Sequence, residues 1–291
     1  IEKTSDFTKA QLGLIVGAVL WGSVVSSLFA GSLSEWFGRK IIIIVSALFF
    51  TLSIPVICAS GLFEGGNFIL MTIGRGLQGA SAGLVGVVVP MYLAECLDSD
   101  SRGKGTGMFQ LLLTIGLVFA AVIGLVVTSV VGAADDMTIK AASKTTAWQT
   151  IFWCSAVPGL ILFFGAFKLK ESPRWLYKKG RKDEALASLA ANNGEEKAKE
   201  ILAEMIAADE ADAKAKAEIA ANAKNDTLFQ KKYIYPFCLA VVILACNQTT
   251  GINSVLNYSV DIFQKTGLQG AFANWSDLAI KLVNMIMTIV A

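Results

Sequence analysis

The feature that most constrains this chain is a series of long stretches that are almost free of charge. Six windows contain very few Asp, Glu, Lys or Arg residues: 10–34, 41–63, 68–94, 105–134, 148–167 and 233–260. A seventh apolar window covers 275–291. About 20 apolar residues are enough for a helix to cross the hydrocarbon core of a bilayer. The windows therefore predict an all-α, polytopic membrane bundle rather than a soluble protein with a large core.

Composition agrees with a membrane protein and excludes several kinds of chemistry. Charged residues make up 16% of the chain, against about 25% in soluble domains. Histidine is absent, which excludes histidine acid–base chemistry and histidine metal ligands. None of the five cysteines has metal-ligand spacing to another, so they are expected to be reduced packing residues: Cys58, Cys96, Cys154, Cys238 and Cys246. We expect neither a metal nor a cofactor.

The placement of basic residues predicts the orientation of the chain. Loops 34–40, 95–104 and 170–232 fall on the same side of the membrane if the windows alternate, and they carry more Lys and Arg than the opposite loops. The positive-inside rule assigns these three loops to the cytoplasm. The predicted regions are an N-terminal bundle, a cytoplasmic helical insert and the start of a second bundle: 1–169, 170–232 and 233–291. The insert is rich in Ala, Glu and Lys and predicts short surface helices, or partly frayed ones.

Polar groups inside the windows need partners. Arg75 lies about seven residues inside the third window, where a buried charge is costly. No acid lies at comparable depth, so its partner would be a backbone carbonyl, water, or an acid outside this sequence. Lys281 is expected to snorkel toward the outer surface. Gln110 stands alone on the fourth window. Three glycines below Arg75 predict close helix packing: Gly79, Gly83 and Gly86.

The stretch NQTTGINSVLNY, residues 247–258, concentrates polar groups in the second half of an apolar window. On a continuous helix these groups would surround most of the axis. The segment is therefore either buried within the bundle or unwound near Gly251, and unwound backbone at that depth requires a water-filled cavity. Asn and Gln side chains offer both donors and acceptors, which suits a neutral, hydroxyl-rich solute.

Four motifs in order resemble those of the sugar porters of the major facilitator superfamily. They are GSLSEWFGRK, GRGLQGASAG followed by PMYLAE and RG, ESPRWL, and QTTGIN. The resemblance covers essentially the whole sequence and implies that it holds helices two to eight of a twelve-helix fold. Helix one and helices nine to twelve would then lie outside it, so the predicted bundle is incomplete.

The resemblance also implies roles for individual residues. Those expected to bind substrate are Gln110, Asn247, Gln248, Asn253 and Asn284. Arg75 matches an arginine that works with an acid on helix one in proton-coupled members. Asn257 and Tyr258 lie at the position of an outer gate that the family builds from two tyrosines, the first of which Asn257 replaces. A cytoplasmic salt-bridge network is implied for Glu35, Arg39, Glu95, Arg102, Glu171 and Arg174. From the sequence, Glu95 can pair with either Arg39 or Arg102.

The sequence as a whole is interpreted as a carrier that moves a neutral monosaccharide, a hexose or pentose, by alternating access. The alternatives are a uniporter of another polyol-like solute, a membrane-embedded enzyme, and a channel. An enzyme is disfavoured by the absence of HExxH and of a P-loop, and a channel by the absence of a TVGYG-like filter. We expect a monomer in the plasma (cell inner) membrane, with lipid around it, sugar and not nucleic acid as its partner, and proton coupling left open.

Overall fold

The computed structural model describes residues 7–63, 67–97, 99–132, 137–222, 231–251, 255, 259, 260, 262, 263, 265, 266 and 271–290. Every regular element in these ranges is a helix, which confirms the predicted all-α class. The chain divides into two compact units, Ile1–Lys199 and Glu200–Ala291. The division falls inside the predicted insert 170–232.

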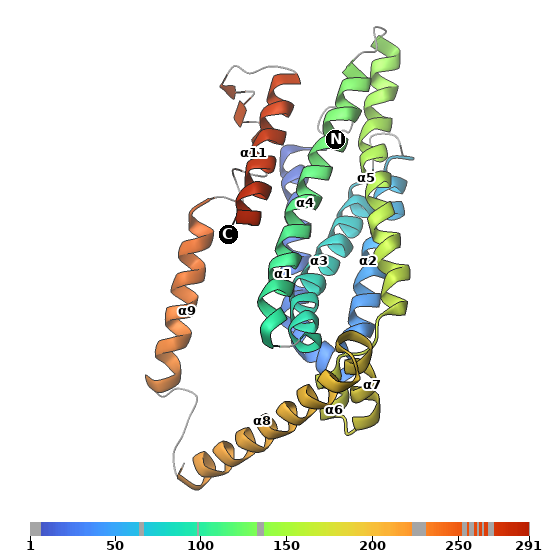
Figure 1. Cartoon of the computed structure of the whole chain (residues 1–291). Helices are drawn as coiled ribbons and strands as arrows, with labels where there is room; N and C mark the ends of the chain where they lie inside the picture. Colours follow the sequence, from blue (N-terminus) through green and yellow to red (C-terminus); the bar gives the residue numbers. More distant parts are fainter. Residues whose placement is uncertain are drawn as a thin grey trace. The chain divides into compact units, whose positions relative to one another are not determined.

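The first unit contains seven helices among its described residues (Figure 1). They are α1 (Lys9–Phe37), α2 (Arg39–Ser60), α3 (Phe68–Cys96), α4 (Ser99–Gly132), α5 (Met137–Lys168), α6 (Pro173–Lys178) and α7 (Lys182–Asn193). Stretches of α1 to α5 are long and apolar enough to cross a membrane: Ala10–Phe37, Arg39–Ser60, Phe68–Cys96, Gly103–Val127 and Trp148–Lys168. Five of the predicted windows are thus confirmed as helices of the required length and composition.

Side-chain caps define where the first helices begin. Thr8 Oγ1 accepts a hydrogen bond from the Gln11 N–H at 3.3 Å, and the Gln11 side chain accepts from the Thr8 N–H at 2.9 Å. This reciprocal pair satisfies two donors that the first turn of α1 would otherwise leave free. Asn67 caps α3 in the same way, accepting from the N–H groups of Ile69 and Leu70. The helix starts are therefore fixed by local chemistry.

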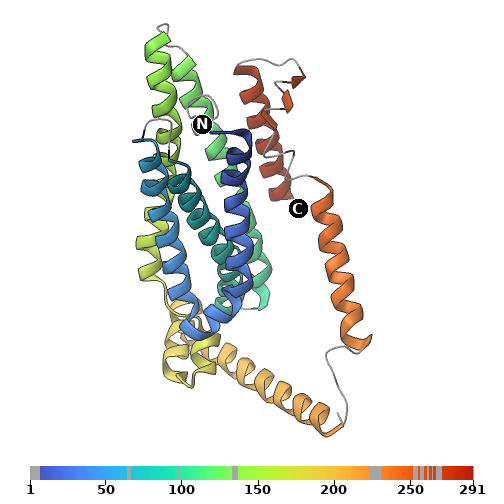
Figure 2. The same ribbon diagram turned by 180° about the vertical axis from the view of Figure 1, so that it is seen from behind.

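Close backbone contact joins α1 to α3, which lie side by side in both views (Figures 1 and 2). A Cβ added at Gly79 would collide with the Val19 carbonyl, and one at Gly83 would collide with the Ser23 carbonyl. Lipid offers no hydrophobic drive for helix association, so such close packing is a main source of attraction. The predicted packing role is confirmed for these two glycines. For Gly86, which is exposed and has nothing described within 4 Å of an added Cβ, the packing role stays a prediction.

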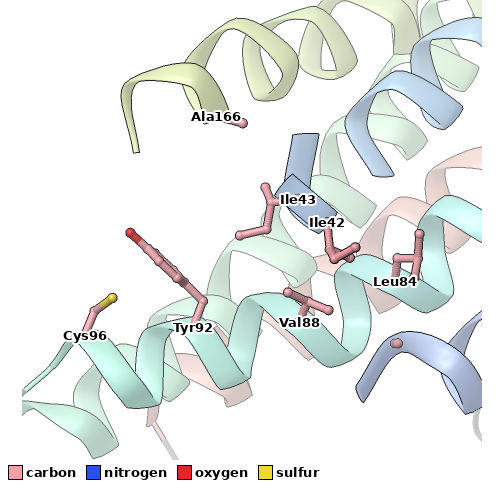
Figure 3. Packing of buried hydrophobic residues seen from close by; sticks show 8 residues of the cluster. Ile42, Ile43, Leu84, Val88, Tyr92, Cys96 and Ala166 are labelled. Atoms are coloured by element: carbon pink, nitrogen blue, oxygen red, sulfur yellow. The ribbon is translucent and has the colours of Figure 1, made fainter. Parts of the chain in front are cut away.

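A buried cluster near one end of the first unit holds α1, α2, α3 and α5 together. Its members are Ala30, Ile42, Ile43, Leu84, Val88, Tyr92, Cys96 and Ala166. Figure 3 shows Ile42 and Ile43 on α2 facing the side chains of α3. Tyr92 also donates a hydrogen bond from its hydroxyl to the Lys170 carbonyl at 2.8 Å. The cluster therefore positions the first turn of α2, the last turns of α3 and the segment that follows α5.

The predicted insert is more helical than expected. Besides α6 and α7 it contains α8 (Glu195–Asn222), a helix of 28 residues that crosses the boundary between the two units. The expectation of short or frayed helices is therefore wrong for α8. Its Ala, Glu and Lys residues are among the strongest helix formers, and their summed propensity favours one long helix over several short ones.

The second unit contains α9 (Lys231–Thr249) and α11 (Ala271–Val290) among its described residues. The described apolar part of α9 includes Ile234–Ile243, within the apolar run YIYPFCLAVVILAC of residues 233–246. The helix stops at Thr249, and Gly251 follows with a φ of +74° in the left-handed region. Residues with a side chain adopt that conformation rarely, so glycine marks the break. Of the two possibilities for residues 247–258, unwinding near Gly251 is the one observed.

Candidate functional site

The first turn of α2 carries a buried arginine whose charge is fully compensated. Arg39 donates to both oxygens of Glu95, from Nη2 to Oε1 at 2.8 Å and from Nε to Oε2 at 2.9 Å. Its remaining Nη1 donates to the Ser34 carbonyl at 3.0 Å. Arg39 is 4% exposed. Two parallel bonds between a guanidinium and a carboxylate form the strongest geometry for such a pair. The pair ties α2 to the last turn of α3.

Glu171 completes the N-terminus of α2 from a distant part of the chain. Its Oε1 accepts from the backbone N–H of Arg39 at 2.8 Å, of Lys40 at 3.1 Å and of Ser172 at 2.9 Å. Gly38 precedes α2 and supplies no side-chain cap. A carboxylate at this end satisfies orphan donors and complements the helix dipole. Glu171 thus acts as the cap that the local sequence of α2 lacks.

Ser172 links the ion pair to α6. Its hydroxyl donates to Glu95 Oε2 at 2.5 Å, and its oxygen accepts from the Trp175 N–H at 3.3 Å. The Trp175 indole in turn donates to the Glu35 carbonyl at 2.8 Å. Ser172 was missed in the sequence, although a serine directly before Pro173 is a typical helix start. These contacts fasten α1, α2, α3 and α6 at one end of the first unit, here called the cytoplasmic cluster: Arg39, Glu95, Glu171 and Ser172.

The structure brings together only part of the implied charge network. Arg39, Glu95 and Glu171 meet as described, while the side chains of Glu35 and Arg174 are exposed. The side chain of Arg102 lies outside the described residues. Further along the surface, Arg181 pairs with Glu184 at 2.6 Å, and this hydrogen bond raises the pKa of the Arg181 guanidinium.

Arg75, seven residues after the start of α3, lacks an acidic partner in the part of the chain that the structure describes. Its Nη1 donates to Gln78 Oε1 at 3.1 Å, and its guanidinium carbon lies 5.5 Å from the centre of the Phe152 ring. Its buried Nε has no hydrogen-bond partner there. An orphaned donor on a buried cation costs free energy. The arginine is therefore held in place but left with unused capacity for an anion.

The residues expected to bind sugar are distributed over both units. Gln110 is exposed on α4, and Asn284 is half-buried on α11. Asn247 and Gln248 lie in the last turn of α9, with side chains outside the described residues. The remaining positions also lie outside the described residues: Asn253, Asn257 and Tyr258. Their assignment stays a prediction.

A buried charge pair lies on α11 and corrects the expectation for Lys281. Lys281 Nζ lies 2.6 Å from Asp277 Oδ2, and the Ser259 hydroxyl donates to Asp277 Oδ1. The side chains of Asp277 and Lys281 are 9% and 16% exposed. Lys281 is therefore paired within the helix and does not snorkel to a surface. Asp277 is only the third residue of the window 275–291, so it does not contradict the expectation that no acid lies as deep as Arg75. The spacing i to i+4 between opposite charges was a visible signal in the sequence.

Comparison with known proteins gives a consistent result. The model of a family described as "Sugar (and other) transporter" matches residues 2–291. A D-xylose transporter of Levilactobacillus brevis is 28% identical over 100% of this chain and 58% of its own length. The major myo-inositol transporter IolT of Bacillus subtilis is 29% identical over 96% of this chain and 54% of its own length.

Solved structures give the same fold. The proton:xylose symporter XylE, bound to 6-bromo-6-deoxy-D-glucose, superimposes with a TM-score of 0.78 at 22% identity, covering 98% of this chain and 60% of that one. A partially occluded, inward-open form of XylE from E. coli superimposes with a TM-score of 0.75 at 20% identity, covering 96% and 61%. The chain spans about three-fifths or less of the length of these relatives.

Proposed function

This chain belongs to the sugar (and other) transporter family, and on that basis we propose that it forms part of a carrier for a neutral monosaccharide or cyclic polyol. The family match over residues 2–291 carries the proposal. Relatives named for xylose, myo-inositol and glucose share one substrate chemistry, a small uncharged ring bearing several hydroxyls. The predicted binding residues have the same chemistry from the protein side, since all five carry amides: Gln110, Asn247, Gln248, Asn253 and Asn284.

The proposed mechanism is alternating access in the plasma membrane. The amides bind sugar hydroxyls at the break after α9 and on α4 and α11. The cytoplasmic cluster keeps the ends of α1, α2, α3 and α6 together, so this part of the first unit moves as a rigid body. Arg75 supports proton coupling, because its buried Nε has no partner among the described residues and can donate to an acid. One solved neighbour is named a proton:xylose symporter, and one relative a proton myo-inositol cotransporter.

Counterflow in proteoliposomes tests the proposal. The full natural protein is reconstituted into vesicles loaded with unlabelled xylose, glucose or myo-inositol. Uptake of the same solute in labelled form is then followed. A carrier gives transient accumulation, whereas an enzyme or a channel does not. Absence of counterflow with all three solutes, in vesicles that retain folded protein, would refute the proposed function.

A point variant locates the site. Gln248→Ala should weaken sugar binding several-fold, since one lost hydrogen bond costs about 0.5–1.5 kcal/mol. Gln149→Ala is the matched control, because it removes the same side chain from a position where the amide donates to the Cys58 carbonyl at 3.3 Å. Equal binding by the Gln248 variant and the parent would remove Gln248 from the site.

A further inference from the structure

The helix α11 carries all its polar residues except Ser276 in a single stripe. Asn274, Asp277, Lys281, Asn284 and Thr288 follow one another at spacings of three and four residues, so they share one face. All five are buried or half-buried, while large apolar residues elsewhere on the helix are exposed: Phe272, Trp275, Val283, Ile286, Met287, Ile289 and Val290. In a membrane protein such a stripe faces other protein groups or an aqueous path, and the apolar face meets lipid.

The centre of the stripe is a cluster of three side chains, here called the α11 clamp: Ser259, Asp277 and Lys281. Each oxygen of the Asp277 carboxylate has its own donor, the Ser259 hydroxyl on one side and the Lys281 ammonium on the other. Ser259 is 3% exposed and Asp277 is 6% exposed. Ser259 precedes Asp277 by 18 residues. The clamp therefore joins a segment that follows the polar stretch 247–258 to α11.

Packing alone does not explain a charged clamp. Removing a carboxylate and an ammonium from water costs several kcal/mol for each ion, and apolar residues of similar size often stabilise such a position equally well. What a hydrogen-bonded ion pair adds is a defined register between the elements that it joins. Asn284, a predicted sugar contact, lies on the same stripe one turn beyond Lys281.

We propose that Ser259, Asp277 and Lys281 position the sugar site. The clamp sets the register of α11 against the segment around Ser259, and thereby the place of Asn284 relative to the polar stretch 247–258. These are positioning residues, and none of them needs to touch the sugar. The proposal rests on the proposed function, because it concerns the affinity of that site.

The experiment compares one single variant with one double variant. Lys281→Met leaves the Asp277 carboxylate buried without its counter-charge. The dissociation constant for sugar should then rise about tenfold or more, since removing one partner of a buried pair is strongly unfavourable and tenfold corresponds to about 1.4 kcal/mol. Adding Asp277→Asn removes the stranded charge and keeps an acceptor for Ser259. The double variant should bind within about threefold of the parent. Ser259→Ala should weaken binding severalfold while the charge pair stays intact.

Hydrogen exchange of residues 255–266 is measured on the same samples without sugar, and it reports the clamp independently of the proposed function. Faster exchange and weaker binding in Lys281→Met, both restored in the double variant, support the proposal. Weak binding that the double variant does not restore would make Lys281 a direct sugar contact and overturn it. Unchanged exchange in Lys281→Met would show that no clamp exists. Altered exchange with unaltered affinity would leave the clamp without a role in binding. If Lys281→Met exchanges faster than the parent but the parent binds no sugar, the clamp exists and the proposed function is refuted. The positioning role is then refuted as well.

Discussion

Two buried arginines of the first unit, Arg39 and Arg75, have opposite environments. Every side-chain nitrogen of Arg39 donates a hydrogen bond, and a carboxylate receives two of these bonds side by side. Arg75 lies seven residues after the start of α3 with one amide and one aromatic ring as its partners, and its Nε has none among the described residues. The two side chains are chemically identical, so the difference lies in what the fold places around them.

The comparison separates a buried charge that stabilises the fold through a complete set of partners from a buried charge whose partners are incomplete. A buried ion pair with complete hydrogen bonding contributes specificity, and breaking it strands a charge. An incompletely paired cation contributes little to stability, and a protein retains it where it acts on something else. Arg39 therefore stabilises the cytoplasmic cluster, whereas Arg75 keeps a buried donor that has no partner among the described residues.

The largest effect is expected from Glu95→Gln. The variant removes the counter-charge of Arg39 and should cost about 3–5 kcal/mol, the usual cost of breaking a buried pair. Thermal or denaturant unfolding in detergent measures this loss. Glu184→Gln is the matched control, because its pair with Arg181 is exposed and such pairs contribute about 0–1 kcal/mol. Similar losses in the two variants would erase the distinction between the cytoplasmic cluster and a surface pair.

Glu171→Gln should have the next largest effect, about 1.5–3 kcal/mol, the range for a hydrogen bond to a charged group. The first turn of α2 loses the negative charge that caps it, so the amides of Arg39 and Lys40 should exchange with deuterium faster. The amides of Ile69 and Leu70 provide an internal control, since Asn67 caps them separately. Unaltered exchange at α2 would contradict the capping role of Glu171.

Ser172→Ala should cost less, about 0.5–2 kcal/mol, the range for losing a helix N-cap. It removes the hydroxyl that joins Glu95 to α6 but leaves the ion pair intact. Ser27→Ala serves as the control, because that hydroxyl donates only to the Val24 carbonyl of its own helix in the contacts described. A loss as large as that of Glu95→Gln would mean that the serine, rather than the ion pair, holds the cytoplasmic cluster together.

Arg75→Met should have the smallest effect on stability, within about 1 kcal/mol, since apolar replacement of an imperfectly paired buried charge is often neutral. The same substitution at Arg39 should be several times more costly. Proton-driven sugar accumulation should nevertheless fall more in Arg75→Met than counterflow does. If the Arg75 and Arg39 variants lose the same free energy of unfolding, or if accumulation and counterflow fall equally in Arg75→Met, then Arg75 is structural. The proposed difference between the two arginines would then be wrong.

The membrane-spanning helices could be predicted from the sequence, whereas the contacts between side chains of different helices could not. A run of 20 apolar residues has essentially one solution in a bilayer, so five spans followed from composition. The partner of Glu95 did not follow, because Arg39 and Arg102 are both close to it in any reasonable topology. The choice of Arg39 depends on how the buried cluster aligns the first turn of α2 with the last turn of α3, and that alignment involves contacts 56 residues apart.

The candidate site shows the same limit. Gly251 indicated the break after α9 because its backbone requirement is local. The capping of α2 by Glu171 was not predictable, since it joins residues 132 positions apart. Asp277 was overlooked although its pairing with Lys281 is local, four residues apart on one helix. Local signals were readable in this sequence, and long-range pairings were not.

The one-residue turn at Gly38, between α1 and α2, limits where a tag or reporter can be inserted into this protein. One glycine, with a φ of +98°, both ends α1 and begins α2, and any Cβ there would collide with the Glu171 carboxylate. An epitope, a protease site or a reporter cysteine placed at that turn would disrupt the topology that it was meant to map. The exposed turn at Gly194, between α7 and α8, has nothing described within 4 Å of an added Cβ, and because its own φ of +84° favours glycine, an insertion there should keep Gly194 itself. Tags and fluorescent reporters on this face belong there.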